Sequence, residues 1–323
     1  NSCLIVLNTK KAVKTLYENF SIEMPDVKVI YLTTNLCAAH RLEIIQEIKS
    51  FLIKNRNNKS QKKLICISTQ LIEAGVDLDF DCVYRSMAGI DSLVQCAGRC
   101  NREGKLSING RYIRGRIYII NYEIENLGNL RDIKHTVDTS EEAIRSMKIV
   151  DEDAEISLDP IKSYCFNKYY KQNEQRLYYW NTKTNENMIE QLSVNLSLRT
   201  EHRQLYHIKY PYQLAQSFRT AADTFELIQQ DTVGIIVHYK NDELIEQLYL
   251  AINNRDSYAI SLLLKKLQRT TVNVYYNEKL KPYVSNILSN ECGYKDGQIL
   301  LLGKHHYDDH MGIVTEGLED LIF

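Results

Sequence analysis

The sequence predicts an α/β domain, with a parallel sheet covered by helices on both faces, followed by a mostly helical α+β accessory domain. Up to about residue 120, short segments rich in Ile, Val, Leu and Cys alternate with segments that have helical spacing. Near-continuous apolar strands separated by helices are typical of a parallel sheet buried on both faces. Further along, the sequence becomes polar and charged and then rich in tyrosine. This change of rhythm indicates a second domain of a different kind.

The first domain is expected to span residues 1–125 and to alternate strand and helix. The helix at 38–55 carries an apolar stripe with a period of 3.6 residues, formed by Leu42, Ile44, Ile45, Ile48, Phe51 and Leu52. In chain order, the expected strands are 3–7, 27–32, 64–68, 82–86 and 115–120. The expected helices are 10–20, 38–55, a short one that ends at Gly75, and 91–102.

A polar and charged segment at 126–153 is expected to be a linker, with a helix that opens at Asp138 in the run D-T-S-E-E. The accessory domain is then expected to span 154–323. It is mostly helical in pattern. Its expected strands are 233–237, 271–275 and 298–302.

Composition limits the class of protein. A chain of 323 residues is long enough for about two domains, and 44% hydrophobic with 25% charged residues is ordinary for a soluble globular protein. No apolar run approaches the roughly 20 residues that cross a bilayer, and the sequence does not open on a signal-peptide pattern. We therefore expect a cytoplasmic protein without a membrane partner. The net charge of −1 excludes a globally basic DNA binder but permits a local basic channel.

The metal-ligating residue types do not form a recognisable site in the sequence. The eight cysteines are spread singly, without a C-x-x-C pair, so we expect them to be reduced and structural. His305, His306 and His310 offer metal-ligand spacing, but Gly303 and Gly312 bracket them closely, as in an exposed turn. We expect no metal site.

The sharpest chemical pattern is Q-C-A-G-R-C-N-R at residues 95–102. On the helix predicted there, Gln95, Gly98, Arg99 and Arg102 would share one face, because residues three and four apart are neighbours. Guanidinium groups suit phosphate, since they are always charged and bind two oxygens at once. Taken alone, the pattern is equally typical of a solvated basic helix face.

A second pattern, S-T-Q-L-I-E-A-G-V-D-L-D, lies at residues 68–79 directly after a buried strand. Its hydroxyl pair falls at the carboxyl end of the strand, where open α/β sheets bind ligands. Gly75 permits a tight turn, and the carboxylate of Asp77 has the reach to meet a ribose hydroxyl. The simpler alternative is a strand–turn–helix with a Ser or Thr cap.

Together, these two patterns resemble motifs V and VI of superfamily 2 helicases. The run Y-L-T-T-N-L-C-A-A-H-R at 31–41 resembles a stretch of the CRISPR-associated helicase-nuclease of type I interference systems. The segments S-F-R-T-A-A-D-T-F at 217–225 and L-Q-R-T-T-V-N-V at 267–274 are similar to that family's C-terminal domain. The chain thus resembles the C-terminal half of that family: a second RecA-like lobe and the accessory domain.

The resemblance implies ATP with Mg²⁺ as cofactor, held mainly by a first RecA-like lobe that lies upstream in such proteins. Gly75 and Asp77 would touch the nucleotide. Arg99 and Arg102 would stabilise charge on the γ-phosphate, and Gln95 would position that group or the attacking water. The implied catalytic residues of this chain are therefore the glutamine and the two arginines.

The same resemblance implies that single-stranded DNA is gripped by its phosphate backbone. The expected contacts are Asn8, Thr9, Thr33, Thr34 and Thr69. A guide-RNA surveillance complex would recruit the motor, and the upstream lobe and a nuclease domain would be further partners. The chain departs from the family pattern at Cys96, where an arginine is usual, and at Ala38, where a proline is usual.

The sequence carries neither a G-x-x-x-x-G-K-[ST] loop nor a D-E-x-H box, and the family's nuclease domain is absent from it. Because the chain opens inside an apolar strand, we expect it to come from a longer protein. The prediction is an ATP-dependent DNA helicase-nuclease of CRISPR interference in which this chain, isolated, is inactive. Two alternatives stay open: a non-catalytic DNA- or partner-binding module, and a lobe of a restriction or repair helicase.

Overall fold

The computed structural model describes most of the chain, namely residues 2–56, 62–108, 110–128, 131–147, 158–168, 180–181, 186–193, 200, 203–207, 218–224, 232–276, 278–288 and 298–314. The chain divides into two compact units. One combines Asn1–Ala154 with Asp231–Phe323, and the other is Glu155–Gln230. The last part of the predicted accessory region therefore shares a unit with the first domain. The predicted boundaries at 125 and 153 remain predictions.

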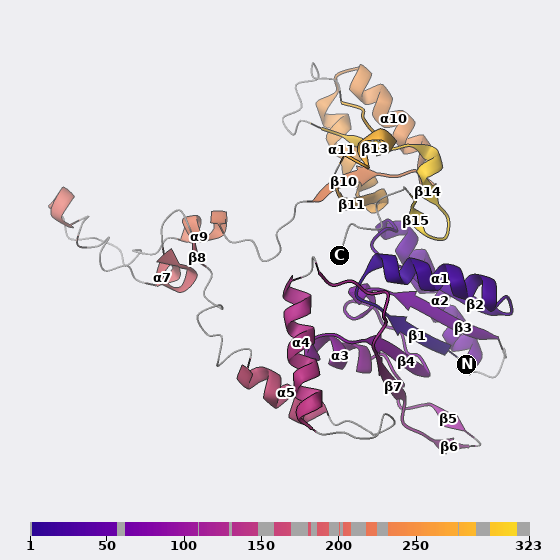
Figure 1. Ribbon diagram of the computed structural model, residues 1–323. Coiled ribbons are helices and arrows are strands. Elements are labelled where there is room, and N and C mark those ends of the chain that lie inside the picture. Colours follow the sequence, from indigo (N-terminus) through magenta and orange to yellow (C-terminus); the bar gives the residue numbers. More distant parts are fainter. Residues whose placement is uncertain are drawn as a thin grey trace. The chain divides into compact units, whose positions relative to one another are not determined.

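The first unit contains a five-stranded parallel sheet in the order β2-β3-β1-β4-β7 (Figure 1). The strands are β1 (Ser2–Val6), β2 (Val27–Leu32), β3 (Lys63–Ser68), β4 (Cys82–Ser86) and β7 (Arg116–Ile120). Each coincides with an expected strand to within one residue at either end. The prediction of an α/β fold with a parallel sheet is confirmed.

Helices connect these strands: α1 (Lys10–Glu23), α2 (Ala38–Arg56), the 3₁₀ turn η1 (Gln70–Ile72) and α3 (Ile90–Ala97). The chain crosses the sheet in one direction from β1 to β2 and returns from β2 to β3. Right-handed crossovers therefore place α1 and α2 on opposite faces. Of the apolar stripe predicted for α2, Ile48 and Leu52 are buried in the core, whereas Leu42 is 52% exposed.

The helix predicted at 91–102 begins within one residue of α3, but the prediction was too long, because α3 ends at Ala97. Gly98 caps it and donates its N–H to the Val94 carbonyl at 3.0 Å. Beyond the cap, Cys100 forms a β-bridge with Phe80, which draws the chain back toward the sheet. Arg99 and Arg102 therefore do not share a helix face with Gln95.

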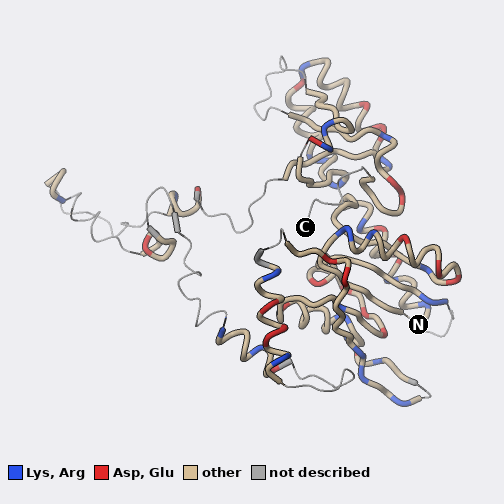
Figure 2. Tube along the Cα trace, in the orientation of Figure 1, with Lys and Arg blue, Asp and Glu red and all other residues tan. Residues whose placement is uncertain are grey.

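One element was not predicted, and another begins earlier than predicted. A small hairpin, β5 (Ser107–Ile108) with β6 (Arg111–Tyr112), precedes β7, and Lys and Arg line this stretch (Figure 2). Helix α4 (Arg131–Ser146) occupies much of the predicted linker and begins well before Asp138. Its close approach to the start of α3 explains Gly89, since a Cβ there would lie 3.0 Å from the side chain of Thr136.

The C-terminal part of the first unit holds a four-stranded mixed sheet in the order β11-β10-β13-β12. Its strands are β10 (Thr232–Ile236), β11 (Thr271–Tyr275), β12 (Val284–Asn286) and β13 (Leu300–Leu302). Helices α10 (Asp242–Asn253) and α11 (Ser257–Leu267) pack on it through a buried apolar cluster. Short turns follow at η3 (Gln268–Thr270), η4 (Lys281–Tyr283) and η5 (Lys304–His306), and the chain then forms the hairpin β14 (Tyr307–Asp308) with β15 (Gly312–Ile313). The three predicted strands are confirmed.

The second unit is described in short pieces: α5 (Leu158–Phe166), β8 (Trp180–Asn181), β9 (Glu186–Asn187), α7 (Met188–Leu192) and α9 (Phe218–Thr224). Asn187 and Glu190 form a reciprocal capping box at the start of α7. In the part of the chain that the structure describes, no helix is both long and apolar enough to cross a membrane.

Candidate functional site

The five predicted DNA contacts lie together at one edge of the parallel sheet. Asn8 and Thr9 follow β1, Thr33 and Thr34 follow β2, and Thr69 follows β3. These three strands are neighbours in the sheet. The carboxyl ends of parallel strands form the ligand-binding edge of open α/β folds. The structure therefore brings the five predicted residues to one edge of the sheet, and their role in DNA binding stays a prediction.

Most of these five side chains are nevertheless buried. The exposed fractions of Asn8, Thr33 and Thr69 are 1%, 0% and 2%. The Thr9 hydroxyl caps α1 by accepting the Ala12 N–H at 3.2 Å. Thr34 is half-buried and is the most accessible of the five. A phosphate at this edge would therefore meet Thr34 or backbone groups.

Hydrogen bonds fix the loop that carries Thr34. The Thr33 hydroxyl donates to the Tyr31 hydroxyl at 2.9 Å and accepts the Asn35 N–H at 3.1 Å. Leu36 donates its N–H to the Thr33 carbonyl at 3.3 Å, which closes a turn around Thr34. The conformation of this loop is thus set by neighbours on both sides of the threonine.

The carboxylate of Glu125 accepts hydrogen bonds from the backbone N–H groups at the start of α1. Glu125 accepts the N–H of Asn8 and, at 3.1 Å, the N–H of Thr9. Its other oxygen accepts the Asn8 side-chain amide at 2.9 Å and the hydroxyl of Ser86. An anion at a helix N-terminus is favoured by the helix dipole and by the unpaired amides there. In this structure the protein itself supplies that anion.

The predicted nucleotide residues lie on the surface after η1. Gly75 has φ +74°, in the left-handed region that favours glycine, so the tight turn predicted there is confirmed. The Asp77 side chain is 75% exposed and pairs with Arg102, whose Nη1 lies 2.5 Å from Oδ1. Lys49 lies farther away, with Nζ 3.9 Å from Oδ2.

The two predicted arginine fingers have different surroundings. Arg99 turns back toward η1, donating from Nε to the Ile72 carbonyl at 3.1 Å and from Nη2 to the Glu73 carbonyl at 2.6 Å. Arg102 is 49% exposed, and its guanidinium pairs with the surface carboxylate of Asp77. Gln95 is exposed on α3. The structure thus joins residues 68–79 to residues 95–102 through both arginines.

The backbone of this junction is also fixed. The Asp79 carboxylate accepts the Arg102 N–H at 2.7 Å and the Glu103 N–H at 3.0 Å. Asp79 is buried. A buried carboxylate that accepts two amides restrains the turn on which Arg102 stands.

Sequence reasoning missed a buried ion pair behind these segments. Arg85 on β4 is 1% exposed, and its Nε lies 3.0 Å from Oε1 of Glu73. Its Nη1 donates to the side-chain oxygen of Asn8 at 2.8 Å. The hydroxyl of Ser92 on α3 donates to the same Glu73 oxygen at 2.6 Å. The sequence carries one signal for this ion pair, namely a single arginine inside the otherwise apolar strand C-V-Y-R-S, where a charged residue needs a buried partner.

Cys96, which departs from the family pattern, belongs to the same region. Its side chain is fully buried, and Sγ lies 3.5 Å from Oε1 of Glu73. Burial raises the pKa of the Cys96 thiol to about 12. The group is therefore a neutral thiol packed against the ion pair, as expected for a structural cysteine.

The site fits only part of a nucleotide complex. Asp77 and Arg102 offer an exposed carboxylate and a guanidinium, which suit a ribose hydroxyl and a phosphate. Across the described residues, no three His, Cys, Asp or Glu side chains gather closely enough to hold a metal ion. His306 packs on the ring of Tyr283, with 4.6 Å between centroids.

Comparison with known proteins identifies the first part of the chain. Residues 1–105 match the family model described as CRISPR-associated nuclease/helicase Cas3, C-terminal. The CRISPR-associated nuclease/helicase Cas3 of Haloferax volcanii is 53% identical over 51 residues, which are 16% of this chain and 5% of that protein. Its counterpart in Streptococcus thermophilus is 31% identical over 120 residues, or 36% of this chain and 12% of that protein. The chain thus matches a small share of these relatives' length.

Solved structures share the fold across nearly the whole chain. The crystal structure of T. fusca Cas3 with ATP superposes with a TM-score of 0.59 at 12% identity, covering 97% of this chain and 38% of that one. A CRISPR RNA-guided surveillance complex in a pre-nicking state contains a chain with a TM-score of 0.51 at 13% identity, covering 94% of this chain and 37% of that one. The expected RecA-like fold is confirmed. Residues 1–105 therefore correspond to the C-terminal helicase region of Cas3 proteins, and the chain as a whole shares the fold of that region.

Proposed function

We propose that the chain is the C-terminal part of an ATP-dependent, single-stranded DNA translocase and helicase-nuclease that acts against foreign DNA in CRISPR interference. One observation carries the proposal. Residues 68–79 and 95–102, which resemble helicase motifs V and VI, are joined by the contacts of Arg99 with η1 and of Arg102 with Asp77. A motor needs these two segments to move as one body against a partner lobe.

ATP with Mg²⁺ would be held mainly by the upstream RecA-like lobe, and would supply the phosphoryl group whose transfer drives the cycle. In this chain, Asp77 would bind the ribose, and the turn at Gly75 would let the backbone come close to the nucleotide. Arg102 is the better placed of the two arginines to reach the γ-phosphate, since its guanidinium is about half exposed and is paired with a surface carboxylate. If the guanidinium of Arg102 left the Asp77 carboxylate for a phosphate, its positive charge would be paired both before and after ATP binds.

Arg99 would act differently. Its guanidinium is engaged by two backbone carbonyls, so it reaches a phosphate only if it leaves them or if the phosphate meets its remaining N–H groups. A guanidinium has five donors, of which these two bonds use two. Gln95, exposed beside it on α3, would orient the γ-phosphate or the attacking water.

Single-stranded DNA would run along the sheet edge formed by the ends of β1, β2 and β3. Thr34 would meet a phosphate directly, while Asn8, Thr9, Thr33 and Thr69 would act mainly through backbone groups and by shaping the edge. Contacts of this kind grip the phosphates without reading bases. A guide-RNA surveillance complex would then choose the target sequence; the similarity to a chain in such a complex supports this partner.

A non-catalytic DNA- or partner-binding module remains the second candidate. The burial of Asn8, Thr33 and Thr69 removes three of the expected side-chain contacts with DNA, which favours the partner-binding form of this module. A restriction or repair helicase is disfavoured by the match of residues 1–105 to the Cas3 C-terminal family.

Steady-state ATPase assays with single-stranded DNA separate the two candidates. The complete protein, with its upstream lobe, is expected to hydrolyse ATP, and the isolated 323-residue chain to be inactive. The chain should still bind single strands of any sequence, with affinity that falls steeply as salt rises. A complete protein that binds DNA but shows no DNA-stimulated turnover would support the module instead.

A further inference from the structure

The hairpin of β14 and β15 grips the loop that follows β2. Gly312 has φ +75°, and a Cβ at this position would lie 2.3 Å from the carbonyl oxygen of Asn35 and 2.9 Å from the Leu36 nitrogen. The next residue, Ile313, donates its N–H to the same Asn35 carbonyl at 3.1 Å. Glycine is therefore required at position 312 for two reasons: its backbone conformation is left-handed, and the loop lies too close to leave room for a Cβ.

The other strand of the hairpin holds the far end of the same loop. The Tyr307 hydroxyl accepts the N–H of Cys37 at 3.0 Å and lies 3.0 Å from Nδ1 of His40. Burial lowers the pKa of His40 and raises that of Tyr307. A neutral His40 can accept a hydrogen bond from the Tyr307 hydroxyl, which itself accepts the Cys37 N–H. The tyrosine therefore bridges the loop and the helix as both acceptor and donor.

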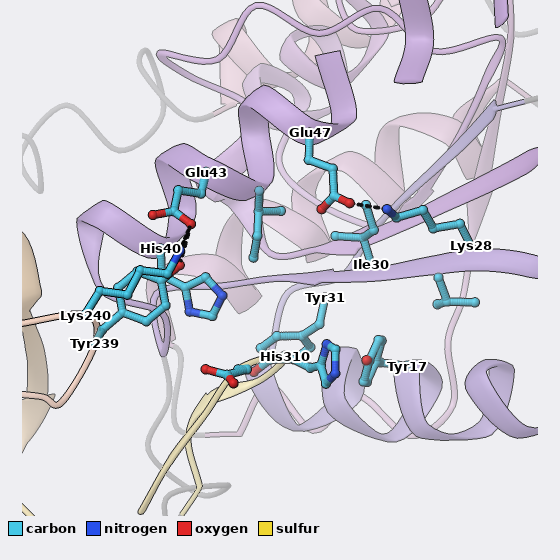
Figure 3. A pocket seen from close by; sticks show the side chains of 13 residues that line it. Tyr17, Lys28, Ile30, Tyr31, His40, Glu43, Glu47, Tyr239, Lys240 and His310 are labelled. Carbon is cyan, nitrogen blue, oxygen red and sulfur yellow. Dashed lines mark hydrogen bonds and ion pairs between the residues drawn. The ribbon is translucent and has the colours of Figure 1, made fainter. Parts of the chain in front are cut away.

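A second element braces this bridge. The ring of Tyr239 stacks on His40 with 4.3 Å between centroids and 14° between planes, and its hydroxyl donates to Glu43 at 2.8 Å. Figure 3 shows these three residues together with Lys240 on one side of a cavity of about 650 Å³. His310, at the tip of the hairpin, lines the other side of that cavity near Tyr17 and Tyr31.

We propose that this hairpin is a positioning element for DNA binding, and that Gly312 and Tyr307 hold the 33–37 loop so that Thr34 meets a backbone phosphate. The inference rests on the proposed function. Thr34 lies between two fixed points, the Asn35 carbonyl held by Ile313 and the Thr33 hydroxyl bonded to Tyr31. Ordering a loop before binding removes an entropic cost that would otherwise weaken the complex.

The test compares glycines of equal backbone strain in the full 323-residue chain. Gly312→Ala introduces a Cβ against Asn35, whereas Gly110→Ala, at φ +78°, introduces one that meets nothing within 4 Å. With a fluorescent oligothymidylate, Gly312→Ala is expected to weaken binding about tenfold and Tyr307→Phe several-fold. Gly110→Ala and His310→Ala, the latter on the same hairpin but facing the cavity, are expected to bind like the parent chain.

A double-mutant cycle with Thr34→Ala distinguishes positioning from a general loss of folding. If the hairpin acts through Thr34, the combined Gly312→Ala and Thr34→Ala variant binds no worse than Thr34→Ala alone, since coupled residues are not additive. Additive losses, or a Gly312→Ala variant that binds like Gly110→Ala, overturn the inference.

Amide hydrogen exchange of residues 33–37 supplies a readout independent of DNA. Exchange is expected to quicken in Gly312→Ala and Tyr307→Phe, and unchanged exchange contradicts the positioning role. A parent chain that fails to bind single strands, while its loop loosens in these variants, points to failure of the proposed DNA site rather than of the hairpin contact.

Discussion

Arg102 and Asp77 form an ion pair at the surface, with Nη1 2.5 Å from Oδ1. Both residues are predicted to contact the nucleotide, and in this structure their side chains contact each other instead. Their side chains are 49% and 75% exposed, so the pair contributes roughly 0–1 kcal/mol to folding. The arginine is therefore held in place by an interaction that a triphosphate would readily replace.

Arg102→Ala in the complete protein is expected to reduce DNA-stimulated ATP turnover about 10³-fold or more, because a finger acts on charge that builds up in the transition state. The free energy of unfolding should change by less than about 1 kcal/mol. Steady-state ATPase and urea denaturation measure the two effects. Arg145→Ala, which removes another exposed arginine from an ion pair with Glu141, is the control. Near-normal turnover in Arg102→Ala would show that Arg102 is not a finger.

Arg99→Ala is expected to lower stability as well as turnover. It leaves the carbonyls of Ile72 and Glu73 without their charged donor, at a cost of roughly 1–3 kcal/mol. Arg99→Lys should recover little of either effect, since an ammonium lacks the planar fork that reaches both oxygens. Urea denaturation of the isolated chain isolates the structural part. A fully stable Arg99→Ala variant would mean that these hydrogen bonds contribute nothing.

Arg85→Ala is expected to be the most destabilising of these substitutions, by about 3–5 kcal/mol, because it leaves the Glu73 carboxylate buried and unpaired. The control is Lys28→Ala, which breaks an exposed pair with Glu47 and should cost less than about 1 kcal/mol. Urea unfolding followed by circular dichroism compares the two. Equal losses in both variants would contradict the role of burial.

The contrast between these arginines marks what the sequence could and could not predict. Apolar runs located the strands, because a parallel sheet buries both faces and tolerates few polar residues. The end of α3 at Ala97 depends on the bridge between Cys100 and Phe80, a tertiary contact without a local signature. The burial of Thr33 and the partnership of Arg85 with Glu73 have the same origin. Residue type and order are enough to propose motif residues, whereas their accessibility depends on packing and is known only from the structure.

Glu125→Gln tests whether phosphate reaches the start of α1. The carboxylate accepts the N–H groups of Asn8 and Thr9, so a DNA phosphate there must displace it. The amide of glutamine keeps one acceptor oxygen for these N–H groups but replaces with a donor the oxygen that accepts from the Asn8 side chain and Ser86. It also removes the competing charge, which is worth about 1 kcal/mol, or roughly fivefold in affinity, near the surface. Fluorescence anisotropy with labelled single-stranded DNA is expected to show tighter binding. Unchanged affinity would mean that Asn8 and Thr9 do not contact DNA through these amides.

The contact between the C-terminal hairpin and α2 is expected to weaken in mild acid. Burial, opposed in part by Asp309 and Glu43, lowers the pKa of His40 below its usual value of about 6.5. Between that value and the lower one of the folded protein, the unfolded chain binds more protons than the folded chain. Stability is therefore complete above about pH 6.5 and is lost as the pH falls toward the folded pKa.

In the neutral ring that accepts the Tyr307 hydroxyl at Nδ1, 3.0 Å away, Nε2 carries the ring proton. Protonation therefore occurs at Nδ1 and prevents it from accepting this hydrogen bond. Amide exchange of residues 33–37 is thus expected to quicken between pH 7 and pH 5, beyond the intrinsic pH dependence of exchange. His40→Gln retains a polar side chain without a titrating group, and should exchange with the intrinsic dependence alone. If the parent chain and His40→Gln respond to pH alike, His40 is not the group that loosens the hairpin, and the acid sensitivity must come from the carboxylates around it.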